Sequence, residues 1–335
     1  MTTALALFSG GLDSLLACRV IQNQGIKVKA LKFVSPFFDY DLLARQDEYC
    51  SEIFTRYGID VELIDISAPF LQMLAAPAHG YGKNFNPCVD CKILLVSTAK
   101  GLMARYDASF LITGEVVGQR PMSQRQDTLR IIERESGTDG LLLRPLCCRA
   151  LKKTKAEEQG LIDPDALPHF HGRNRTPQIE LAARLGITDF PSPAGGCILT
   201  EPLRAARMRA LYNLHQPHLL TPDNIRFLLQ GRQYRFPSGA WLSMGRNEAE
   251  NDHIESLQLE RDLIIRAAAE RPGPSGLLRF SQDRADHELA AAIVGRYLKK
   301  NDARIQEMQV IDHEGQSHIL KVEPAGPEEI EALRW

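Results

Sequence analysis

Two groups of residues in this chain have side chains whose types and spacing could do chemistry. The first is the turn SGGLDS, which ends a short apolar run and opens a helical pattern. Glycines let the backbone bend sharply and approach a ligand closely. Free N–H groups at the start of a helix, together with the helix dipole, favour an anion such as phosphate. The predicted phosphate-binding residues are Phe8, Ser9, Gly10, Gly11, Asp13 and Ser14.

Asp13 is the unexpected member of this turn, because a carboxylate repels phosphate oxygens. Its presence is explained if it holds Mg²⁺, a cation that joins carboxylates to phosphates. The turn lacks the GK[ST] ending of a Walker A loop, so hydrolysis of a γ-phosphate is not indicated. A glycine-rich turn of any doubly wound fold is the plainer interpretation, but the complete hexapeptide between a strand and a helix favours nucleotide binding.

Cysteines form the second group. The chain has seven, an odd number at irregular spacing, which favours metal binding or catalysis over structural disulfides. Cys88 and Cys91 lie in NPCVDCK, a spacing compatible with zinc, an Fe–S cluster or a redox pair, and Cys197 follows two glycines in PSPAGGC. Three cysteines without an evident fourth indicate an open, reactive site.

Other candidate ligands exist, although we favour a structural interpretation of each. The candidates for a fourth ligand are Cys147, Cys148, His169 and His171. We expect the two thiols to be partly buried and the two histidines to be ordinary surface or core residues. Cys18 and Cys50 lie on predicted helices and are expected to be inert.

The elements that position these residues alternate between strands and helices. Strands are predicted at 4–8, 27–34, 61–66, 108–114 and 141–146, with intervening helices that include 42–57 and 93–106. This alternation predicts a doubly wound parallel α/β sheet covered on both faces. Ligands of such sheets lie at the carboxyl ends of the strands, where the glycine turn and residues 114–124 are both placed. The two segments are therefore expected to converge.

The length of 335 residues predicts more than one domain. We expect an ATP-binding domain over 1–150, an extension over 151–215 that carries Cys197, and a smaller α+β domain over 216–335. In the last domain we predict helices near 248–270 and 286–300, and strands at 305–311 and 318–322.

Composition sets limits on function. The hydrophobic share of 44% and charged share of 24% are ordinary for a globular protein. The net charge of −2 means that any nucleic-acid surface must be a local patch. No apolar run approaches the ~20 residues that span a membrane, and the first apolar run lacks the features of a signal peptide. We therefore expect a cytoplasmic protein with no membrane partner.

The motifs together resemble those of a known family. SGGLDS resembles the signature of the PP-loop ATP pyrophosphatases, which cleave ATP between its α- and β-phosphates to adenylate a carbonyl or carboxyl oxygen. ITGEV, residues 112–116, resembles the second nucleotide element of that family, which implies that Thr113 and Gly114 line the AMP half. NPCVDCK, TGEVVGQRPMSQ and PSPAGGC are similar to the tRNA-thiolating branch, which includes the 2-thiouridine and 4-thiouridine synthases.

This resemblance implies a tRNA uridine thiolase that uses ATP and Mg²⁺. It implies that Cys88, Cys91 and Cys197 hold a [4Fe–4S] cluster whose fourth iron binds hydrosulfide, and that Cys197, Cys88 and Asp13 are catalytic. A rival route within the branch needs no iron, because one cysteine carries a persulfide and another resolves it as a disulfide. The sulfur donor is accordingly hydrosulfide or the persulfide of a cysteine desulfurase.

Two features bear on RNA docking within this resemblance. The chain begins at the PP-loop and so is expected to lack the N-terminal RNA-binding (THUMP) region of the standard 4-thiouridine synthase. Four polar residues after the nucleotide turn either contact phosphate or base or belong to an ordinary polar loop. These are Gln119, Arg120, Ser123 and Gln124.

The segment FPSGAWLSMGRNEAENDHI, residues 236–254, resembles the NFACT-type RNA-binding module, whose pattern Gly245, Arg246, Asn247 and Asn251 match. Arg246 can fork onto a phosphate, Asn247 can cap the following helix, and Asn251 can bond RNA or the loop. Six more arginines add local positive charge, although by themselves they would be an ordinary solvated face. They are Arg204, Arg207, Arg209, Arg226, Arg232 and Arg235. The partner implied is tRNA.

Two other functions stay open on the sequence alone. An adenylating ligase or amidotransferase with a small-molecule substrate would explain SGGLDS but would leave the cysteines and the GRN motif without a role. A non-enzymatic RNA-binding protein with a spent nucleotide fold conflicts with the intact Asp13 and turn hydroxyls. A homodimer is compatible with the sequence, which does not fix the oligomeric state.

Overall fold

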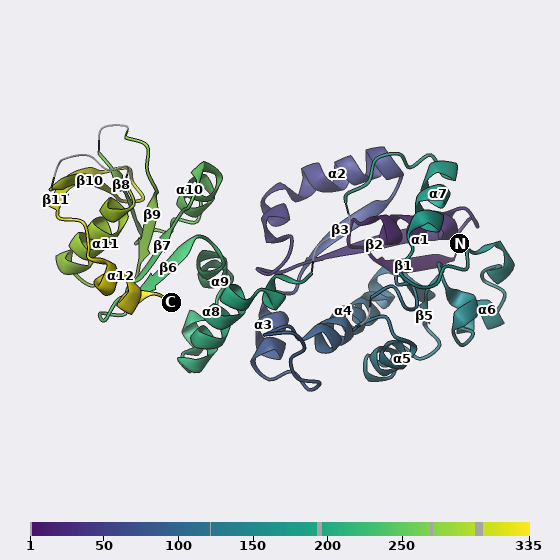
Figure 1. The fold of residues 1–335 in the computed structure, drawn as a ribbon. Helices are drawn as coiled ribbons and strands as arrows, with labels where there is room; N and C mark the ends of the chain where they lie inside the picture. Colours follow the sequence, from purple (N-terminus) through teal and green to yellow (C-terminus); the bar gives the residue numbers. More distant parts are fainter. Residues whose placement is uncertain (1, 121, 193–195, 269–270, 299–303) are drawn as a thin grey trace. The chain divides into compact units, whose positions relative to one another are not determined.

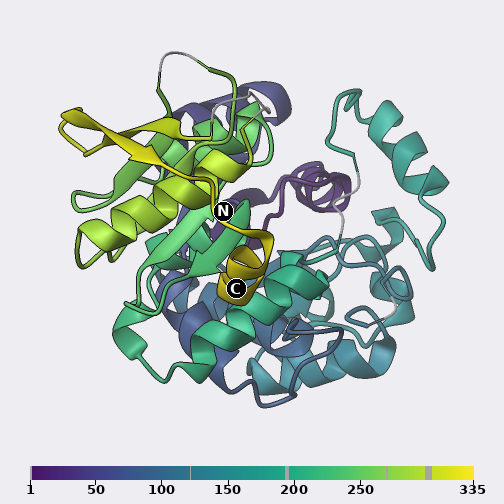
Figure 2. The ribbon, with the colours of Figure 1, turned by 60° about the vertical axis from the view of Figure 1, so that its left-hand side comes forward.

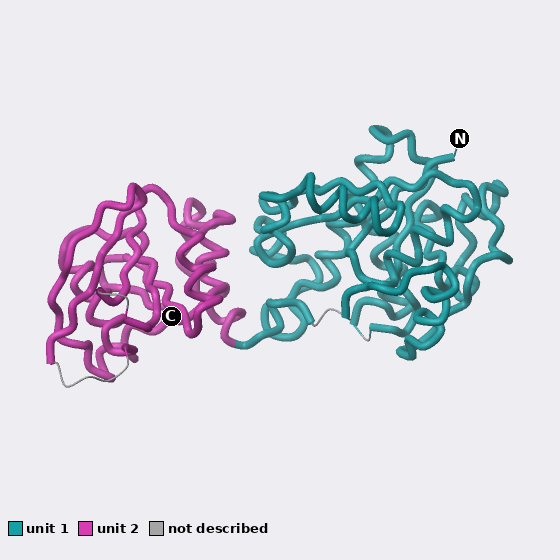
Figure 3. Tube along the Cα trace, turned by 90° about the horizontal axis from the view of Figure 1, so that it is seen from above, with its two compact units in different colours: residues 1–202 teal, residues 203–335 magenta. Residues whose placement is uncertain are grey.

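The computed structural model describes residues 2–120, 122–192, 196–268, 271–298 and 304–335. The chain divides into two compact units, residues 1–202 and 203–335 (Figure 3). Residues 151–202, which include Cys197, belong to the first unit.

The first unit is built on a parallel sheet of five strands in the order β3-β2-β1-β4-β5. The strands are β1 (Thr3–Leu7), β2 (Lys27–Val34), β3 (Asp60–Asp65), β4 (Phe110–Thr113) and β5 (Leu142–Leu143). Their residues are mainly apolar and buried, as a sheet covered on both faces requires. The predicted α/β fold is confirmed. β5 is shorter than predicted because the chain turns at Arg144, whose carbonyl accepts from the N–H of Cys147 at 3.0 Å.

Helices cover both faces of this sheet (Figure 1). They are α1 (Leu12–Gln22), α2 (Gln46–Tyr57), α3 (Ser67–Ala75), α4 (Cys88–Leu102), α5 (Gln126–Glu135), α6 (Lys155–Glu158) and α7 (Thr176–Arg184). α4 packs between α3 and α5, whereas α7 packs on α1. The helix predicted over 93–106 begins five residues earlier, at Cys88, because Pro87 caps it and accepts from the N–H of Cys91 at 2.8 Å. Both cysteines of the CxxC motif therefore lie on the first turn of α4.

The second unit has an antiparallel sheet in the order β11-β10-β8-β9-β7-β6. Its strands are β6 (Arg232–Arg235), β7 (Trp241–Met244), β8 (Leu263–Ala267), β9 (Gly276–Arg279), β10 (Gln306–Ile311) and β11 (Ser317–Val322). Its helices are α8 (Pro202–Asn213), α9 (Pro222–Leu229), α10 (Glu248–Glu255), α11 (Arg284–Arg296) and α12 (Pro327–Leu333). α11 packs along the sheet (Figure 2).

One helix prediction in this unit is wrong. The helix expected over 248–270 ends at Glu255, and residues 263–267 form β8. β8 pairs with β10 and β9, and Ile265 and Ala267 face the core. Pairing with strands far along the chain therefore outweighs the local helical pattern. The predicted strands at 305–311 and 318–322 correspond to β10 and β11.

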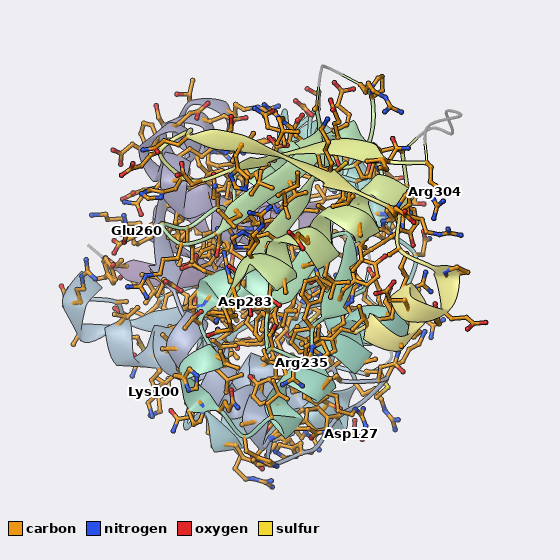
Figure 4. All side chains as sticks on the ribbon, turned by 90° about the vertical axis from the view of Figure 1, so that its left-hand side faces the viewer. Lys100, Asp127, Arg235, Glu260, Asp283 and Arg304 are labelled. Atoms are coloured by element: carbon orange, nitrogen blue, oxygen red, sulfur yellow. The ribbon has the colours of Figure 1, made fainter. Side chains whose placement is uncertain are left out.

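The surface of the second unit carries charges of both signs, among them Arg235, Glu260, Asp283 and Arg304 (Figure 4). Within the part of the chain that is described, no helix has the length and apolarity needed to cross a membrane.

Candidate nucleotide and cysteine site

The glycine turn joins the carboxyl end of β1 to α1. Gly10 has a φ of +82°, in the left-handed region that glycine adopts at little cost. Gly11 precedes the helix in an extended conformation, and no side chain caps the helix start. The hydroxyls of Ser9 and Ser14 lie 3.2 Å apart, and that of Ser14 donates to the carbonyl of Gly11 at 2.8 Å. Both hydroxyls are thus held at the turn beside the uncapped helix start.

Gly114, at the end of β4, lies against the same turn. A Cβ atom on Gly114 would be 2.5 Å from the carbonyl carbon and oxygen of Asp13 and 2.6 Å from the nitrogen of Ser14, so a side chain is excluded. β1 and β4 are neighbouring parallel strands, and their carboxyl ends therefore meet at one edge of the sheet. The two glycine-containing turns predicted to converge are in backbone contact.

Asp13 has one oxygen in contact with two donors and one without a partner. Its Oδ2 accepts from Nε2 of Gln119 at 2.7 Å and lies 3.4 Å from a guanidinium nitrogen of Arg175. Its Oδ1 is buried and has no hydrogen-bond partner. An orphaned carboxylate oxygen beside a phosphate-type turn is a suitable ligand for Mg²⁺.

A buried lysine donates a hydrogen bond to the backbone of the glycine turn. Lys32 on β2 donates from Nζ to the carbonyl of Ser9 at 2.6 Å and to Oδ2 of Asp39 at 2.5 Å, and it is 4% exposed. The sequence offered a weak signal for this role, namely a lysine inside an otherwise apolar strand. Its contact with the turn depends on strand pairing and was not predicted.

The three predicted cysteines lie close together. Two hydrogen bonds join residues 84–85, just before Cys88, to residues 199–200, just after Cys197. The charges of Cys88 and Cys197 both raise the pKa of Cys91, which places the three thiols near one another. Of the two glycines before Cys197, Gly195 lies outside the described residues.

The thiols are free and mostly shielded from solvent. Burial raises the pKa of Cys91 to about 12, an effect that the neighbouring Lys92 only partly offsets, and burial also raises the pKa of Cys197. Across the described residues, no three His, Cys, Asp or Glu side chains are arranged to hold a metal ion. The thiols of Cys91 and Cys197 are therefore protonated near neutral pH, and they would have to lose that proton to act as ligands.

The remaining candidate ligands are placed differently. Cys147 and Cys148 are buried, and Sγ of Cys147 donates to the carbonyl of Glu115 at 3.3 Å. His169 and His171 are exposed. Both observations agree with the structural interpretation of these residues. Cys18 is buried and Cys50 is half-buried.

A buried network of charges connects the cysteines to the nucleotide turn, and sequence reasoning missed it. Glu115 lies 3.3 Å from Nζ of Lys92 and 3.1 Å from Nε of Arg144, which also pairs with Glu133. Burial alone would raise the pKa of Glu115, but Lys92 and Arg144 outweigh it and lower the pKa. Because Lys92 follows Cys91 and Glu115 follows Gly114, a single ion pair joins the two groups of functional residues.

In the second unit the GRN motif forms the start of α10. Asn247 caps the helix by accepting from the N–H of Glu250 at 2.9 Å. Arg246 forks onto the carboxylate of Glu250, with contacts of 2.7 and 3.0 Å. Asn251 accepts from the N–H of Ser275 at 3.0 Å and donates to the carbonyl of Gly273 at 3.1 Å, so it holds residues 273–275 against the helix.

The other arginines are not one uniform surface. Arg207 is buried and donates to the carbonyls of Leu228 and Gly231. Burial, followed by the nearby charges of Arg246 and Arg204, lowers the pKa of Arg207 to about 10. Arg207 therefore has a structural role, and Arg204 and Arg246 are the positive charges near it, the latter paired with Glu250.

Comparison with known proteins supports both halves of this description. Residues 1–157 match the family model described as thiamine biosynthesis protein (ThiI). Residues 231–334 match the model described as the NFACT protein RNA binding domain. The predicted resemblance to the tRNA-thiolating branch, with an NFACT-type module, is thereby confirmed. The ThiI-family match includes Cys88 and Cys91 but ends before Cys197.

Curated relatives include a probable tRNA sulfurtransferase of Geobacillus kaustophilus, 26% identical over 143 residues (43% of this chain and 34% of that protein). A tRNA sulfurtransferase of Marinobacter nauticus is 29% identical over 144 residues (43% and 28%). The chain thus spans about a third of the length of these relatives.

Solved structures with some likeness include a 4-thiouridine synthetase in complex with RNA and bound ATP, at 18% identity, covering 64% of this chain and 53% of that one, with a TM-score of 0.40. Another is the U34-tRNA thiolase NcsA from Methanococcus maripaludis with its [4Fe-4S] cluster, at 14% identity, covering 68% and 70%, with a TM-score of 0.32.

Gly114→Ala should separate the two turns, because its methyl group cannot fit against the backbone of Asp13. We expect a loss of about 1–3 kcal/mol in the free energy of unfolding, typical of overpacking, and weaker AMP binding by calorimetry. Gly101→Ala in α4 is the control, because nothing lies within 4 Å of its Cβ position. Equal AMP affinity in both variants would contradict the contact.

The raised pKa of Cys91 predicts slow alkylation by iodoacetamide at pH 7.5 in the ligand-free protein, with a rate that keeps rising beyond pH 10. Because the folded-state pKa exceeds that of the unfolded chain, this thiol stabilises the fold below about pH 8.5. The contribution is lost as the pH rises through the folded pKa. Peptide mass spectrometry, with the urea-unfolded chain as reference, measures the rate. A plateau near pH 7 would contradict the assignment.

Proposed function

We propose that this chain is an ATP-dependent tRNA uridine thiolase. The observation that carries the proposal is the connection between the two functional groups within one unit. The ion pair of Lys92 and Glu115 joins the cysteine helix α4 to a nucleotide turn that is in backbone contact with the SGGLDS turn. Adenylation and sulfur transfer need such neighbouring groups, because the activated base must meet a sulfur before water does.

The glycine turn is suited to the pyrophosphate half of ATP. The uncapped start of α1 and the hydroxyls of Ser9 and Ser14 offer donors to phosphate oxygens, and Oδ1 of Asp13 offers a ligand to Mg²⁺. Thr113 and Gly114 would line the AMP half. A uridine carbonyl oxygen attacks the α-phosphate, pyrophosphate leaves, and donors fixed beforehand stabilise the developing negative charge.

The three thiols are suited to the sulfur step. Besides burial, the charge of Cys88 raises the pKa of both Cys91 and Cys197, so the three sulfurs lie near one another. A donor set of three sulfurs fits a [4Fe–4S] cluster with one open iron. When bound, that cluster would supply an iron site at which inorganic sulfide can be delivered to the base. In the cluster-free alternative, a persulfide on Cys197 attacks the adenylated carbon, AMP leaves, and Cys88 closes a disulfide that releases the sulfur.

Either route uses the same adenylated base and the same three residues. The sulfur donor is hydrosulfide in the first and the persulfide of a cysteine desulfurase in the second.

The NFACT RNA-binding domain and the polar loop after β4 are the proposed RNA contacts. In the loop, Gln119 holds Asp13, and Gln124 is buried and accepts from the N–H of Arg120 at 3.1 Å. Arg120 is exposed and is therefore the loop residue best placed for phosphate. In the second unit, Arg246 would exchange Glu250 for an RNA phosphate. A uridine has to be unstacked to reach the thiols.

Incubation with ATP, a sulfide source and unmodified tRNA should give AMP, pyrophosphate and thiouridine, measured by nucleoside mass spectrometry. Cys197→Ser should abolish thiouridine and leave ATP binding intact, because the serine hydroxyl cannot carry the sulfur. Cys50→Ser, at a half-buried cysteine of α2, is the control and should be active. Production of ADP would reject the proposed chemistry, and AMP without tRNA would favour a small-molecule ligase.

Protein purified without oxygen should be brown, absorb near ~400 nm and contain about four irons per chain. Cys88→Ser and Cys91→Ser should remove the colour, whereas Cys50→Ser should keep it. Iron analysis and the visible spectrum measure this directly. A colourless wild-type protein that thiolates tRNA and carries a persulfide would reject the cluster and select the route without iron.

A further inference from the structure

The segment before α7 brings an arginine to the glycine turn, although nothing in the sequence motifs marks it. A guanidinium nitrogen of Arg175 lies 3.4 Å from Oδ2 of Asp13, and the side chain is 24% exposed. Its Nε is buried and has no hydrogen-bond partner. Arg175 therefore has one weak ionic contact and further donor capacity at the place where the proposed phosphates would lie.

The position of Arg175 does not depend on that contact. Upstream in the same segment, the N–H of Gly172 donates to the carbonyl of Val117 and that of Phe170 donates to the carbonyl of Leu146, both at 2.8 Å. α7 itself packs on α1. The backbone thus holds the arginine beside the turn whether or not Asp13 is its partner.

A second contact from α7 acts on Asp13 through Gln119. Gln178 is fully buried and donates from Nε2 to Oε1 of Gln119 at 3.3 Å, and Gln119 in turn donates to Asp13 at 2.7 Å. Both donors converge on Oδ2, which leaves Oδ1 without a partner. The carboxylate is therefore neutralised by Arg175 but keeps one oxygen ready for a cation.

We propose that Arg175 is a pyrophosphate-binding residue, held by Asp13 until Mg²⁺–ATP takes over that carboxylate. The inference rests on the ATP-pyrophosphatase part of the proposed function. Once Asp13 coordinates Mg²⁺, the guanidinium of Arg175 no longer has that carboxylate as its counter-charge. It then lies beside the negatively charged phosphates, and its planar donors can pair with two phosphate oxygens. Without ligand, Arg175 and Asp13 neutralise each other. When pyrophosphate forms, the positive charge of Arg175 is available to it.

The probe is inorganic pyrophosphate, titrated calorimetrically with and without Mg²⁺, with AMP titrated separately. Arg175→Gln should weaken pyrophosphate binding at least tenfold, about 1.4 kcal/mol, and leave AMP affinity unchanged. Arg173→Gln is the matched control, because it removes the same charge from an exposed position two residues earlier. Arg175→Lys keeps the charge but loses the planar fork, and should be intermediate.

Asp13→Asn tests the exchange itself. Removing the carboxylate charge should release Arg175, so binding of pyrophosphate without Mg²⁺ should strengthen, and the gain from Mg²⁺ should disappear. In the double variant with Arg175→Gln the Mg²⁺-free gain should be absent. If Asp13→Asn leaves Mg²⁺-free binding unchanged, the restraint by Asp13 is rejected.

The outcomes separate this inference from the thiolase proposal. If Arg175→Gln and Arg173→Gln lose pyrophosphate affinity equally, the effect is one of overall charge, and the assignment of Arg175 as a pyrophosphate-binding residue is overturned. Joint loss of AMP affinity and thermal stability in Arg175→Gln and Arg175→Lys would make Arg175 a structural latch and also overturn it. Arg175-dependent pyrophosphate binding without tRNA thiolation would uphold the inference and reject the thiolase. If the protein thiolates tRNA but its pyrophosphate affinity does not depend on Arg175, the thiolase proposal is upheld and the inference about Arg175 is rejected.

Discussion

The backbone contact between Gly114 and Asp13 is the constraint on which the candidate site depends. Neighbouring parallel strands β1 and β4 end at one edge of the sheet, and the absence of a side chain at Gly114 lets their turns meet. A glycine turn alone would indicate only a general anion-binding site. Its contact with a second turn brings together the two segments that we propose bind the two halves of ATP.

Ion pairs connect the nucleotide turns to two other parts of the first unit. Toward the cysteines, Glu115 is kept ionised by Lys92 and Arg144 and so joins α4 to the nucleotide turn. Toward α7, Asp13 is paired with Arg175. A buried ion pair gives little net stability but strongly penalises separation of its partners. The ion pairs of Glu115 therefore serve positioning, because they hold α4 and the segment at Arg144 against the nucleotide turn.

The sequence was informative where local pattern decides the structure. β2 has its predicted bounds because KVKALKFV alternates between polar and apolar residues, as a strand does, and the two glycine turns were correctly expected to converge. The start of α4 was missed because NPCVDC has no apolar period. β8 was missed because its pairing with β10 is non-local. Lys32 and Arg175 contact the turn across 23 and 162 positions, and no local signal encodes such a contact.

Closeness of the three thiols to the nucleotide turn is not enough for sulfur chemistry, because the thiols must also ionise. Burial keeps Cys91 and Cys197 protonated near neutral pH, which protects them from oxidation but also makes them poor ligands and nucleophiles. Lys92 lowers the pKa of Cys91 without overcoming burial. Its ammonium is shared with Glu115, so a ligand that reorganises the nucleotide turn would also change the charge beside the thiols. In the proposed thiolase, Lys92 is therefore the residue that contacts the nucleotide turn and also lies next to a thiol.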